Sequence, residues 1–373
     1  MTVGELTKYL EDWAPPGAAW EKDNVGLQIG SRGDTIKNIM LSLELDEEVL
    51  TEALQNNCNF IFTHHPLIFK PIKRLDTQKD PTARLIQKII KNDITVYSAH
   101  TNLDFTKDGV SYELAKAFKL TNIRFLELEE SNQFKVVVFV PKFSLDDVSR
   151  AVFSAGAGVI GEYDNCGFSL SGEGTFKGSA KSSPVIGKKN LLEKVDEIRF
   201  EFLVDSWKLK KVIASLLDSH PYEEPAYDIY PLRNKNVNYG AGAIGDLAAG
   251  MSEKEFLEFV SRTLKTKGIK YCGGKKQPIK KVAVCGGSGS ELIEKAIESK
   301  ADAFVTADIK YHAYQDAAGK ILLADAGHYE TEIVVLNSVQ DKIKSFLPSK
   351  SEIKVLKYKG STNPIKFYKP QGA

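Results

Sequence analysis

The sequence lacks an excess of charge of either sign. Fifty lysine and arginine residues stand against 49 aspartate and glutamate residues, which leaves a net charge of +1 at pH 7. A chain with almost no net charge has no long-range electrostatic attraction to a polyanion, so we do not expect nucleic acid as a partner.

Cysteines and long apolar runs are also scarce. The four cysteines show no C-x-x-C spacing and sit in or beside β-like or glycine-rich stretches, as buried free thiols do. No stretch reaches the ~20 apolar residues of a membrane-spanning helix. Segment 1–13 is an amphipathic helix pattern with acidic residues, unlike a signal peptide. We therefore expect a protein of the reducing cytoplasm with no membrane partner.

Apolar residues are nonetheless abundant enough for real cores. Hydrophobic residues make up 42% of the chain and charged residues 27%, the balance of an ordinary soluble globular protein. A length of 373 residues exceeds what one core usually supports. We expect two compact units, or one unit with a large insertion.

The first third of the chain alternates short β-branched runs with helical patterns. The pattern predicts strands at 38–45, 59–63 and 94–100, and helices at 47–56, 81–91 and 110–118. Strands separated by helices of this length imply crossover connections and a largely parallel sheet. Functional side chains usually emerge at the carboxyl ends of such strands.

The alternation of predicted strands and helices changes near residue 127. Strands are predicted at 134–141, 197–204 and 226–232, helices at 144–155 and 206–218, and two β-like stretches within 160–180. The order is approximately β-α-β-β-α-β with one stretch to spare, which is the ferredoxin-like unit, a module that can be inserted into a host domain. The glycine-rich stretch 238–245 marks its end.

After residue 245 predicted strands and helices alternate again, as in the first third of the chain. The pattern predicts helices at 252–265, 290–298, 312–318 and 329–345, and strands at 281–287, 303–308, 321–327 and 352–360. Both α/β halves offer ligand-type residues just past a strand. This indicates two lobes of one site.

Two neighbouring histidines follow the strand predicted at 59–63. His64 and His65 precede Pro66, which stops the strand ladder. Imidazole is the commonest protein ligand for Zn, Fe, Ni and Cu, and adjacent side chains diverge, so one pair can serve two ions. The alternative is a histidine-rich surface turn.

The next predicted strand brings His100 and Asp104 to the same edge of the sheet. A carboxylate can offer one oxygen to each of two cations, so Asp104 is the natural bridge. The alternatives are an Asx turn or helix cap for Asp104, and a buried core histidine for His100.

A third pair lies at the start of the helix after 321–327. His328 and Glu332 are four residues apart, so they share one helix face within ~5–6 Å. The alternative is an acid favoured by the helix dipole with an incidental histidine. Together the three segments supply five ligands, which suit two ions better than one, since a single open site usually takes three.

A glycine-rich segment, CGGSGSE at 285–291, follows another predicted strand. It lacks the lysine and the full spacing of a phosphate-binding loop. It is either a tight β-to-α turn or a turn that presents amide groups to an anion.

The motifs THHP, SAHTNLD, ADIKYHAYQDA, GHYETE and DNVGLQIG, found across the chain, resemble the Nif-three-like family, whose members are often labelled GTP cyclohydrolase I type 2 homologs. Residues 1–126 and 238–373 resemble the family's two-lobed α/β core with mostly parallel sheets. Residues 127–237 resemble the inserted PII/CutA-like, ferredoxin-fold domain of its longer bacterial members.

The resemblance implies a dinuclear metal centre and a homohexameric ring, a trimer of dimers. Position by position, the family's metal ligands match without substitution at His64, His65, Asp104, His328 and Glu332. His100 and His312 match further polar positions near the metals, and we expect them to handle protons in catalysis, because imidazole titrates near neutral pH. The alternative for His312 is a water-exposed residue at a helix start.

We therefore predict a metal-dependent hydrolase that acts on a nucleotide or related small molecule. Two divalent cations about 3.5–4 Å apart can acidify a water and polarise the bond under attack, with no organic cofactor. Zn or Fe is the first expectation, with Mn or Ni also compatible with the donor set. The other hypothesis is a non-catalytic metal-binding or regulatory ring in which the inserted domain senses a ligand.

Overall fold

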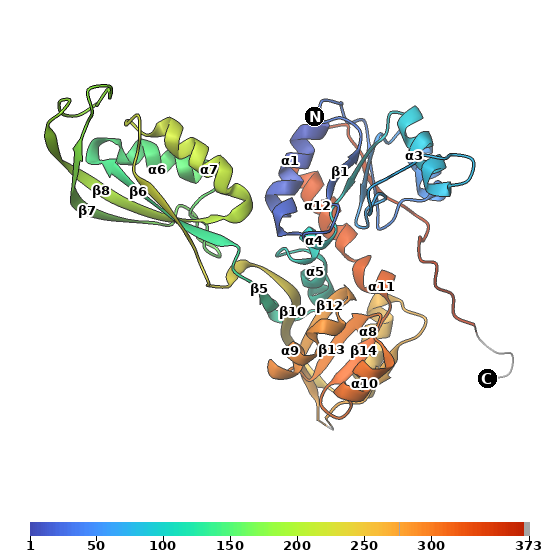
Figure 1. Cartoon of the computed structure of the whole chain (residues 1–373). Coiled ribbons are helices and arrows are strands. Elements are labelled where there is room, and N and C mark those ends of the chain that lie inside the picture. The colour runs from blue at the N-terminus through green and yellow to red at the C-terminus, as the bar shows by residue number, and fades with distance from the viewer. Residues whose placement is uncertain (276, 369–373) are drawn as a thin grey trace. The chain divides into compact units, whose positions relative to one another are not determined.

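The computed structural model, which describes residues 1–275 and 277–368, divides the chain into two compact units (Figure 1). The first unit comprises Met1–Glu127 and Tyr239–Ala373, and the second comprises Leu128–Asn238. In sequence, the second unit therefore lies between two segments of the first. Its assignment as a PII/CutA-like domain stays a prediction.

One sheet of the first unit has the strand order β1-β4-β3-β2-β15. Its strands are β1 (Gly26–Ile29), β2 (Ile39–Ser42), β3 (Phe60–Thr63), β4 (Thr95–Ser98) and β15 (Val355–Lys357). All neighbours are parallel except β1, which runs antiparallel to β4. Every residue of β2, β3 and β4 is buried, as expected of parallel strands covered on both faces.

Helices cover both faces of this sheet. Phe60 and Phe62 belong to an apolar cluster with residues of α1 (Val3–Trp13) and α12 (Val335–Phe346). Ile61, which points to the opposite face, joins a cluster with α2 (Glu47–Gln55) and α3 (Pro81–Lys91). Two short helices, α4 (Thr101–Asp104) and α5 (Val110–Ala117), follow β4.

A second sheet of the first unit has the order β11-β14-β13-β12-β10-β5. Its strands are β5 (Thr121–Glu129), β10 (Asn236–Met251), β11 (Lys270–Cys272), β12 (Ile279–Ser288), β13 (Ala303–Ala307) and β14 (Leu322–Asp325). The associated helices are α8 (Glu253–Leu264), α9 (Ile293–Glu298), α10 (Tyr311–Ala317) and α11 (His328–Glu332). The central strands β12, β13 and β14 are parallel. β10 and β11 run antiparallel to β12 and β14, so this sheet is mixed, whereas the first sheet is mostly parallel. The predicted α/β class is confirmed.

Two local features in the first unit add to the predictions. The glycine-rich stretch 238–245, predicted to mark the end of the inserted unit, lies at the boundary between the two units and forms part of strand β10. A Cβ at Gly240 would lie 2.3 Å from the carbonyl oxygen of Glu127, so glycine permits the close approach of β10 to β5. The helix predicted at 329–345 is two helices, α11 and α12, because α12 restarts with its apolar face on the first sheet.

The second unit runs in the order β6-α6-β7-β8-α7-β9, with sheet order β7-β8-β6-β9. Its elements are β6 (Gln133–Pro141), α6 (Leu145–Ser154), β7 (Gly167–Lys177), β8 (Leu192–Asp205), α7 (Ser206–Ser219) and β9 (Tyr227–Pro231). Both helices pack on one face of the sheet through a common apolar core (Figure 1). Only one strand forms within 160–180; the other β-like stretch is reduced to a bridge between Ile160 and Tyr163.

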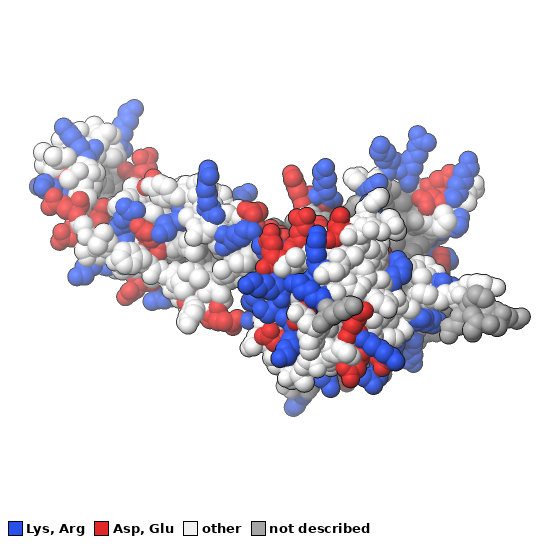
Figure 2. Space-filling view, turned by 90° about the horizontal axis from the view of Figure 1, so that it is seen from below, with Lys and Arg blue, Asp and Glu red and all other residues white. Residues whose placement is uncertain are grey.

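Among the described residues, three short 3-10 helices lie at Pro16–Ala18, Lys142–Ser144 and Ser290–Leu292. Within residues 1–275 and 277–368, no helix is long and apolar enough to cross a membrane. On the face seen in Figure 2, basic side chains lie among acidic ones, in keeping with the near-zero net charge.

Candidate metal centre

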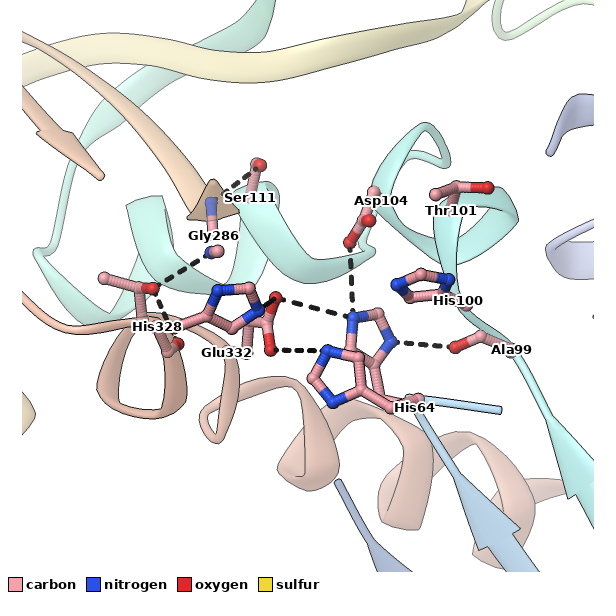
Figure 3. Close-up of polar contacts among 12 residues, drawn as sticks. His64, Ala99, His100, Thr101, Asp104, Ser111, Gly286, His328 and Glu332 are labelled. Carbon is pink, nitrogen blue, oxygen red and sulfur yellow. Dashed lines mark hydrogen bonds and ion pairs between the residues drawn. The ribbon is translucent and has the colours of Figure 1, made fainter. Parts of the chain in front are cut away.

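The histidine pair at the end of β3 is held by the backbone of the neighbouring strand. The amide of His64 donates to the carbonyl of Ser42, and the amide of His65 donates to that of Leu43. The His64 side chain is fully buried, and its Nδ1 lies 2.8 Å from the carbonyl oxygen of Ala99 (Figure 3). A carbonyl can only accept, so Nδ1 carries the proton and Nε2 points into the cluster.

His100 and Asp104 follow β4, and Asp104 ends the short helix α4. Nδ1 of His100 lies 3.0 Å from Oδ1 of Asp23, whose other oxygen accepts from the Thr101 amide at 3.1 Å. Burial alone would raise the pKa of Asp23, but the hydrogen bonds from His100 and Thr101 hold it well below its usual range. The His100 ring centroid lies 5.3 Å from those of both His64 and His65.

The third pair begins α11, directly after β14. Oε1 of Glu332 lies 3.0 Å from Nε2 of His328 and 3.7 Å from Nε2 of His64, while Oε2 lies 3.4 Å from Nε2 of His65. Glu332 is only 3% exposed. One carboxylate therefore faces three imidazoles, with its two oxygens directed at different rings (Figure 3).

Each of the four clustered histidines has one ring nitrogen bound by an oxygen outside the cluster. Besides Ala99 and Asp23, the partners are Glu44, 3.1 Å from Nδ1 of His65, and Asp308, 2.6 Å from Nδ1 of His328. Metal-binding histidines are oriented in this way, because a hydrogen bond at one nitrogen fixes the ring and leaves the other nitrogen to the ion.

The donor atoms of the cluster are arranged as cation ligands are. Among the described residues, three buried atoms in the cluster have no hydrogen-bond partner: Nε2 of His64, Oδ1 of Asp104 and Oε2 of Glu332. Nε2 of His64 lies 3.6 Å from Oδ1 of Asp104. These separations are too long for good hydrogen bonds. Two donors that share one cation lie roughly 3.0–3.6 Å apart, so the residues fit metal ions.

Two overlapping groups within the cluster have the spacing of a metal site. Their ligand atoms lie within 4.8 Å of one another: His64, His65 and His100 in one group, and His65, His328 and Glu332 in the other. His65 belongs to both. Asp104 approaches the first group through His64. The structure therefore brings all five predicted ligands and His100 together; the roles assigned to them stay predictions.

His312 is placed differently. It is exposed on α10, and its ring packs edge-on against Tyr311 with centroids 5.5 Å apart. Neither of the two histidine groups includes it. Its predicted catalytic role receives no support from these contacts.

The sequence interpretation missed four residues that shape the cluster. Three are the carboxylates that orient histidines: Asp23, Glu44 and Asp308. The fourth is Gly287, where a Cβ would lie 2.2 Å from Oε1 of Glu332. Gly287 stands in the segment CGGSGSE, near the end of β12, so the glycine there makes room for the Glu332 carboxylate. Sequence signals existed for three of the four, because Asp23 and Asp308 stand in the motifs DNVGLQIG and ADIKYHAYQDA and Gly287 stands in a glycine-rich segment.

The charges in the cluster compensate one another. Burial alone would lower the pKa of His64, but the carboxylates of Asp104 and Glu332 outweigh it and raise the pKa to about 9. The hydrogen bond to Glu332 raises the pKa of His328 to about 10. Burial raises the pKa of Asp104, whereas the pKa of Glu332 is lowered despite its burial, because histidines surround it. In the metal-free protein, the positive charges of protonated histidines therefore stabilise the carboxylates of the cluster.

We expect the metal-free protein to lose stability as the pH rises. A histidine whose folded pKa exceeds its unfolded value of 6.5 contributes stability that is complete below pH 6.5 and is lost through the folded pKa. For His64 and His328 that window runs from 6.5 to about 9 and about 10. Thermal unfolding with chelator at pH 6.5 to 9.5 measures the loss.

The matched variant is His64→Gln, in which the fall of melting temperature with pH should be shallower. Metal affinity should change in the opposite direction and rise with pH, because the ligands must be deprotonated. A metal-free melting temperature that stays constant from pH 6.5 to 9.5 contradicts the charge assignment.

Asp308→Asn should weaken metal binding by about 10–100-fold, since it removes the anion that orients His328. Asp308 has a left-handed backbone (φ +56°), which asparagine tolerates, so the fold should persist. Asp93→Asn is the control, because Asp93 is exposed and also left-handed (φ +52°). Equal affinities in competition with a chromogenic chelator would show that the 2.6 Å contact to His328 does not serve the metal.

The chain is similar to one family over nearly its whole length. The sequence model of the family described as Duf34/NIF3 (NGG1p interacting factor 3) matches residues 1–364. Curated relatives in Halalkalibacterium halodurans and Bacillus subtilis, each named "GTP cyclohydrolase 1 type 2 homolog", are both 38% identical. Each alignment covers 97% of this chain and 98% of the relative.

One solved structure is also similar to this chain over nearly the whole length of both proteins. The Bacillus cereus protein related to NIF3 is 37% identical, with a TM-score of 0.82, and the match covers 99% of each chain. Because the coverage is nearly complete on both sides, the likeness includes both compact units.

Proposed function

Because the chain belongs to the Duf34/NIF3 family, we propose that its histidine and carboxylate cluster holds two divalent cations in a hydrolase site that acts on a nucleotide or related small molecule. The proposed ligands are His64, His65, Asp104, His328 and Glu332. Relatives named "GTP cyclohydrolase 1 type 2 homolog" support the reaction class. Zn or Fe suits the donors first, then Mn or Ni.

One observation carries the proposal: buried donor atoms of His64, Asp104 and Glu332 converge without hydrogen-bond partners among the described residues. Leaving such atoms unpaired is costly, whereas a shared cation satisfies them. When bound, divalent cations at such a site would acidify a water molecule and polarise the bond to be broken.

His100 is the better placed of the two residues predicted to handle protons. Its Nδ1 is bound to Asp23, and its side chain is 20% exposed, so its other nitrogen can reach a substrate at the rim of the cluster. The Asp23 carboxylate accepts the hydrogen of Nδ1 and fixes the orientation of the ring, as the carboxylate does in other acid–base pairs. We assign His100 the transfer of a proton to or from the substrate.

The proposal includes assembly into a homohexamer, a trimer of dimers, with the second unit as a PII/CutA-like module. Exposed apolar side chains on the edge strand β7 support this, with Phe168 at 63% and Leu170 at 56% exposure. Long exposed edge strands are usually covered in an assembly. Light scattering after size exclusion should give six times the chain mass of 41.3 kDa.

The experiment that tests the site is metal content per chain by elemental analysis, with GTP hydrolysis followed on the same samples. We expect about two metals in the wild type and loss of both metal and activity in Asp104→Ala. Asp12→Ala, an exposed carboxylate on α1, is the control. Two metals without turnover would support the regulatory ring instead, and a wild type without metal contradicts the proposal.

A further inference from the structure

A large aromatic side chain lies exposed beside the cluster. Phe69 is 50% exposed, although phenylalanine is usually buried. Its ring stands edge-on to that of His100, with centroids 6.3 Å apart and planes at 81°. Phe69 therefore presents an apolar surface at the rim of the proposed metal centre.

The backbone next to Phe69 is fixed in place. The amide of Ile68 donates to Oε1 of Gln28 at 3.1 Å, and its carbonyl accepts from Nδ2 of Asn24. Gln28 in turn donates to the carbonyl of Asn24 at 2.7 Å. Asp23, the residue before Asn24, is the one whose carboxylate binds Nδ1 of His100. The segment DNVGLQ thus holds both the histidine and the loop with the exposed ring.

The loop continues with an uncompensated positive charge. Lys70, Lys73 and Arg74 are exposed, and no acidic residue occurs from Pro66 to Leu75. None of the three makes an ion pair or side-chain hydrogen bond with the residues that the structure describes. A half-exposed ring followed by three free cations is suited to a ligand that combines a planar ring with anionic groups.

We propose that Phe69 and the cations after it form the subsite for a nucleotide at the metal cluster, which rests on the proposed function. The base stacks on the Phe69 ring, and the phosphates bind Lys70, Lys73 and Arg74. Phe69 is then a specificity-determining residue: it selects a planar ring, whereas the cations select the charge. Asn24 and Gln28 are positioning residues, since they act through Ile68.

The test is calorimetric binding of GTP and of inorganic tripolyphosphate to the full chain. Phe69→Ala should weaken GTP binding roughly five- to hundredfold, the usual loss per stacked base, and leave tripolyphosphate binding unchanged. Phe69→Trp should keep GTP binding. The triple variant Lys70→Gln, Lys73→Gln, Arg74→Gln should weaken both ligands. Phe143→Ala is the control, an exposed phenylalanine (69%) of the second unit.

The positioning role has its own test. Gln28→Glu keeps an oxygen to accept from the Ile68 amide, whereas Gln28→Leu does not. Gln28→Glu nevertheless loses the NH2 group that donates to the Asn24 carbonyl, so the comparison is made with the wild type: GTP affinity should fall in Gln28→Leu, with tripolyphosphate affinity less affected. Equal GTP affinities in the wild type and Gln28→Leu would remove the positioning role.

Metal content measured on the same samples separates this inference from the proposed function. Normal metal content with equal GTP affinity in wild type and Phe69→Ala overturns the ring subsite and leaves the metal site intact. Absence of metal together with a selective loss of GTP affinity in Phe69→Ala supports the ring subsite and contradicts the proposed metal site. A wild type that binds tripolyphosphate as tightly as GTP, or binds neither, overturns the nucleotide subsite.

Discussion

Glu332→Gln should remove at least one of the two proposed metal ions per chain and lower the affinity for the other by about 100-fold or more. This loss exceeds the roughly 10–100-fold expected from changing a residue that only orients a ligand. Glu332 faces three histidines with both oxygens, at 3.0 Å from Nε2 of His328 and 3.4 Å from Nε2 of His65. Glutamine keeps the shape but replaces one oxygen with an NH2 group, which cannot bind a cation.

The same change should destabilise the metal-free protein. The negative charge of Glu332 helps to keep His64 protonated in a fully buried position, so its loss leaves that charge uncompensated. Both results come from one set of samples, by elemental analysis and by thermal unfolding with chelator. Glu330→Gln is the matched control, because Glu330 lies on the same helix but bonds to Asn363. Two metals at unchanged affinity in Glu332→Gln would contradict the ligand assignment.

The α/β core and the clustering of the proposed ligands were predictable because both depend on local patterns. FIFT at β3 and TVYS at β4 are short buried runs, and the histidines directly follow strand ends, where parallel sheets gather functional groups. His328 and Glu332 share a face by helix periodicity alone. Such patterns can be recognised in the sequence because they depend only on residues that are close together along the chain.

The residues that orient the cluster were not predictable in this way. Asp23 lies 77 residues from His100, Glu44 21 residues from His65, and Asp308 20 residues from His328. No periodicity connects such separations. The contacts exist only once neighbouring strands and loops are placed side by side, so a carboxylate in a loop gives no indication of which histidine it will bind.

Short and glycine-rich strands escaped prediction for a related reason. β10 contains the stretch GAGAIG, whose residues have little intrinsic strand preference. It becomes a strand because β12 pairs with it on one side and β5 on the other. Tertiary contacts, rather than local propensity, determine its conformation.

Gly287→Ala should destabilise the protein by about 2–4 kcal/mol, from a strained backbone and an overpacked site together, and abolish metal binding. Gly287 has φ +65°, and its added Cβ would lie 2.2 Å from Oε1 of Glu332 and 3.2 Å from Nε2 of His328. The backbone cannot shift easily, since its amide donates to Oγ1 of Thr331 and its carbonyl accepts from Thr306. Glu332 must therefore leave its place.

Gly319→Ala separates the two contributions. Gly319 also has a left-handed backbone, φ +73°, but nothing lies within 4 Å of an added Cβ, so its cost is strain alone, about 1 kcal/mol, and metal binding should persist. In the Glu332→Ala background the 2.2 Å clash at residue 287 is removed and only the 3.2 Å approach to Nε2 of His328 remains, so the cost of Gly287→Ala should fall toward that of Gly319→Ala. Denaturant unfolding of the four combinations, each metal-free, measures this coupling. An unchanged cost in that background would mean that the glycine serves the backbone conformation of β12 and not the carboxylate.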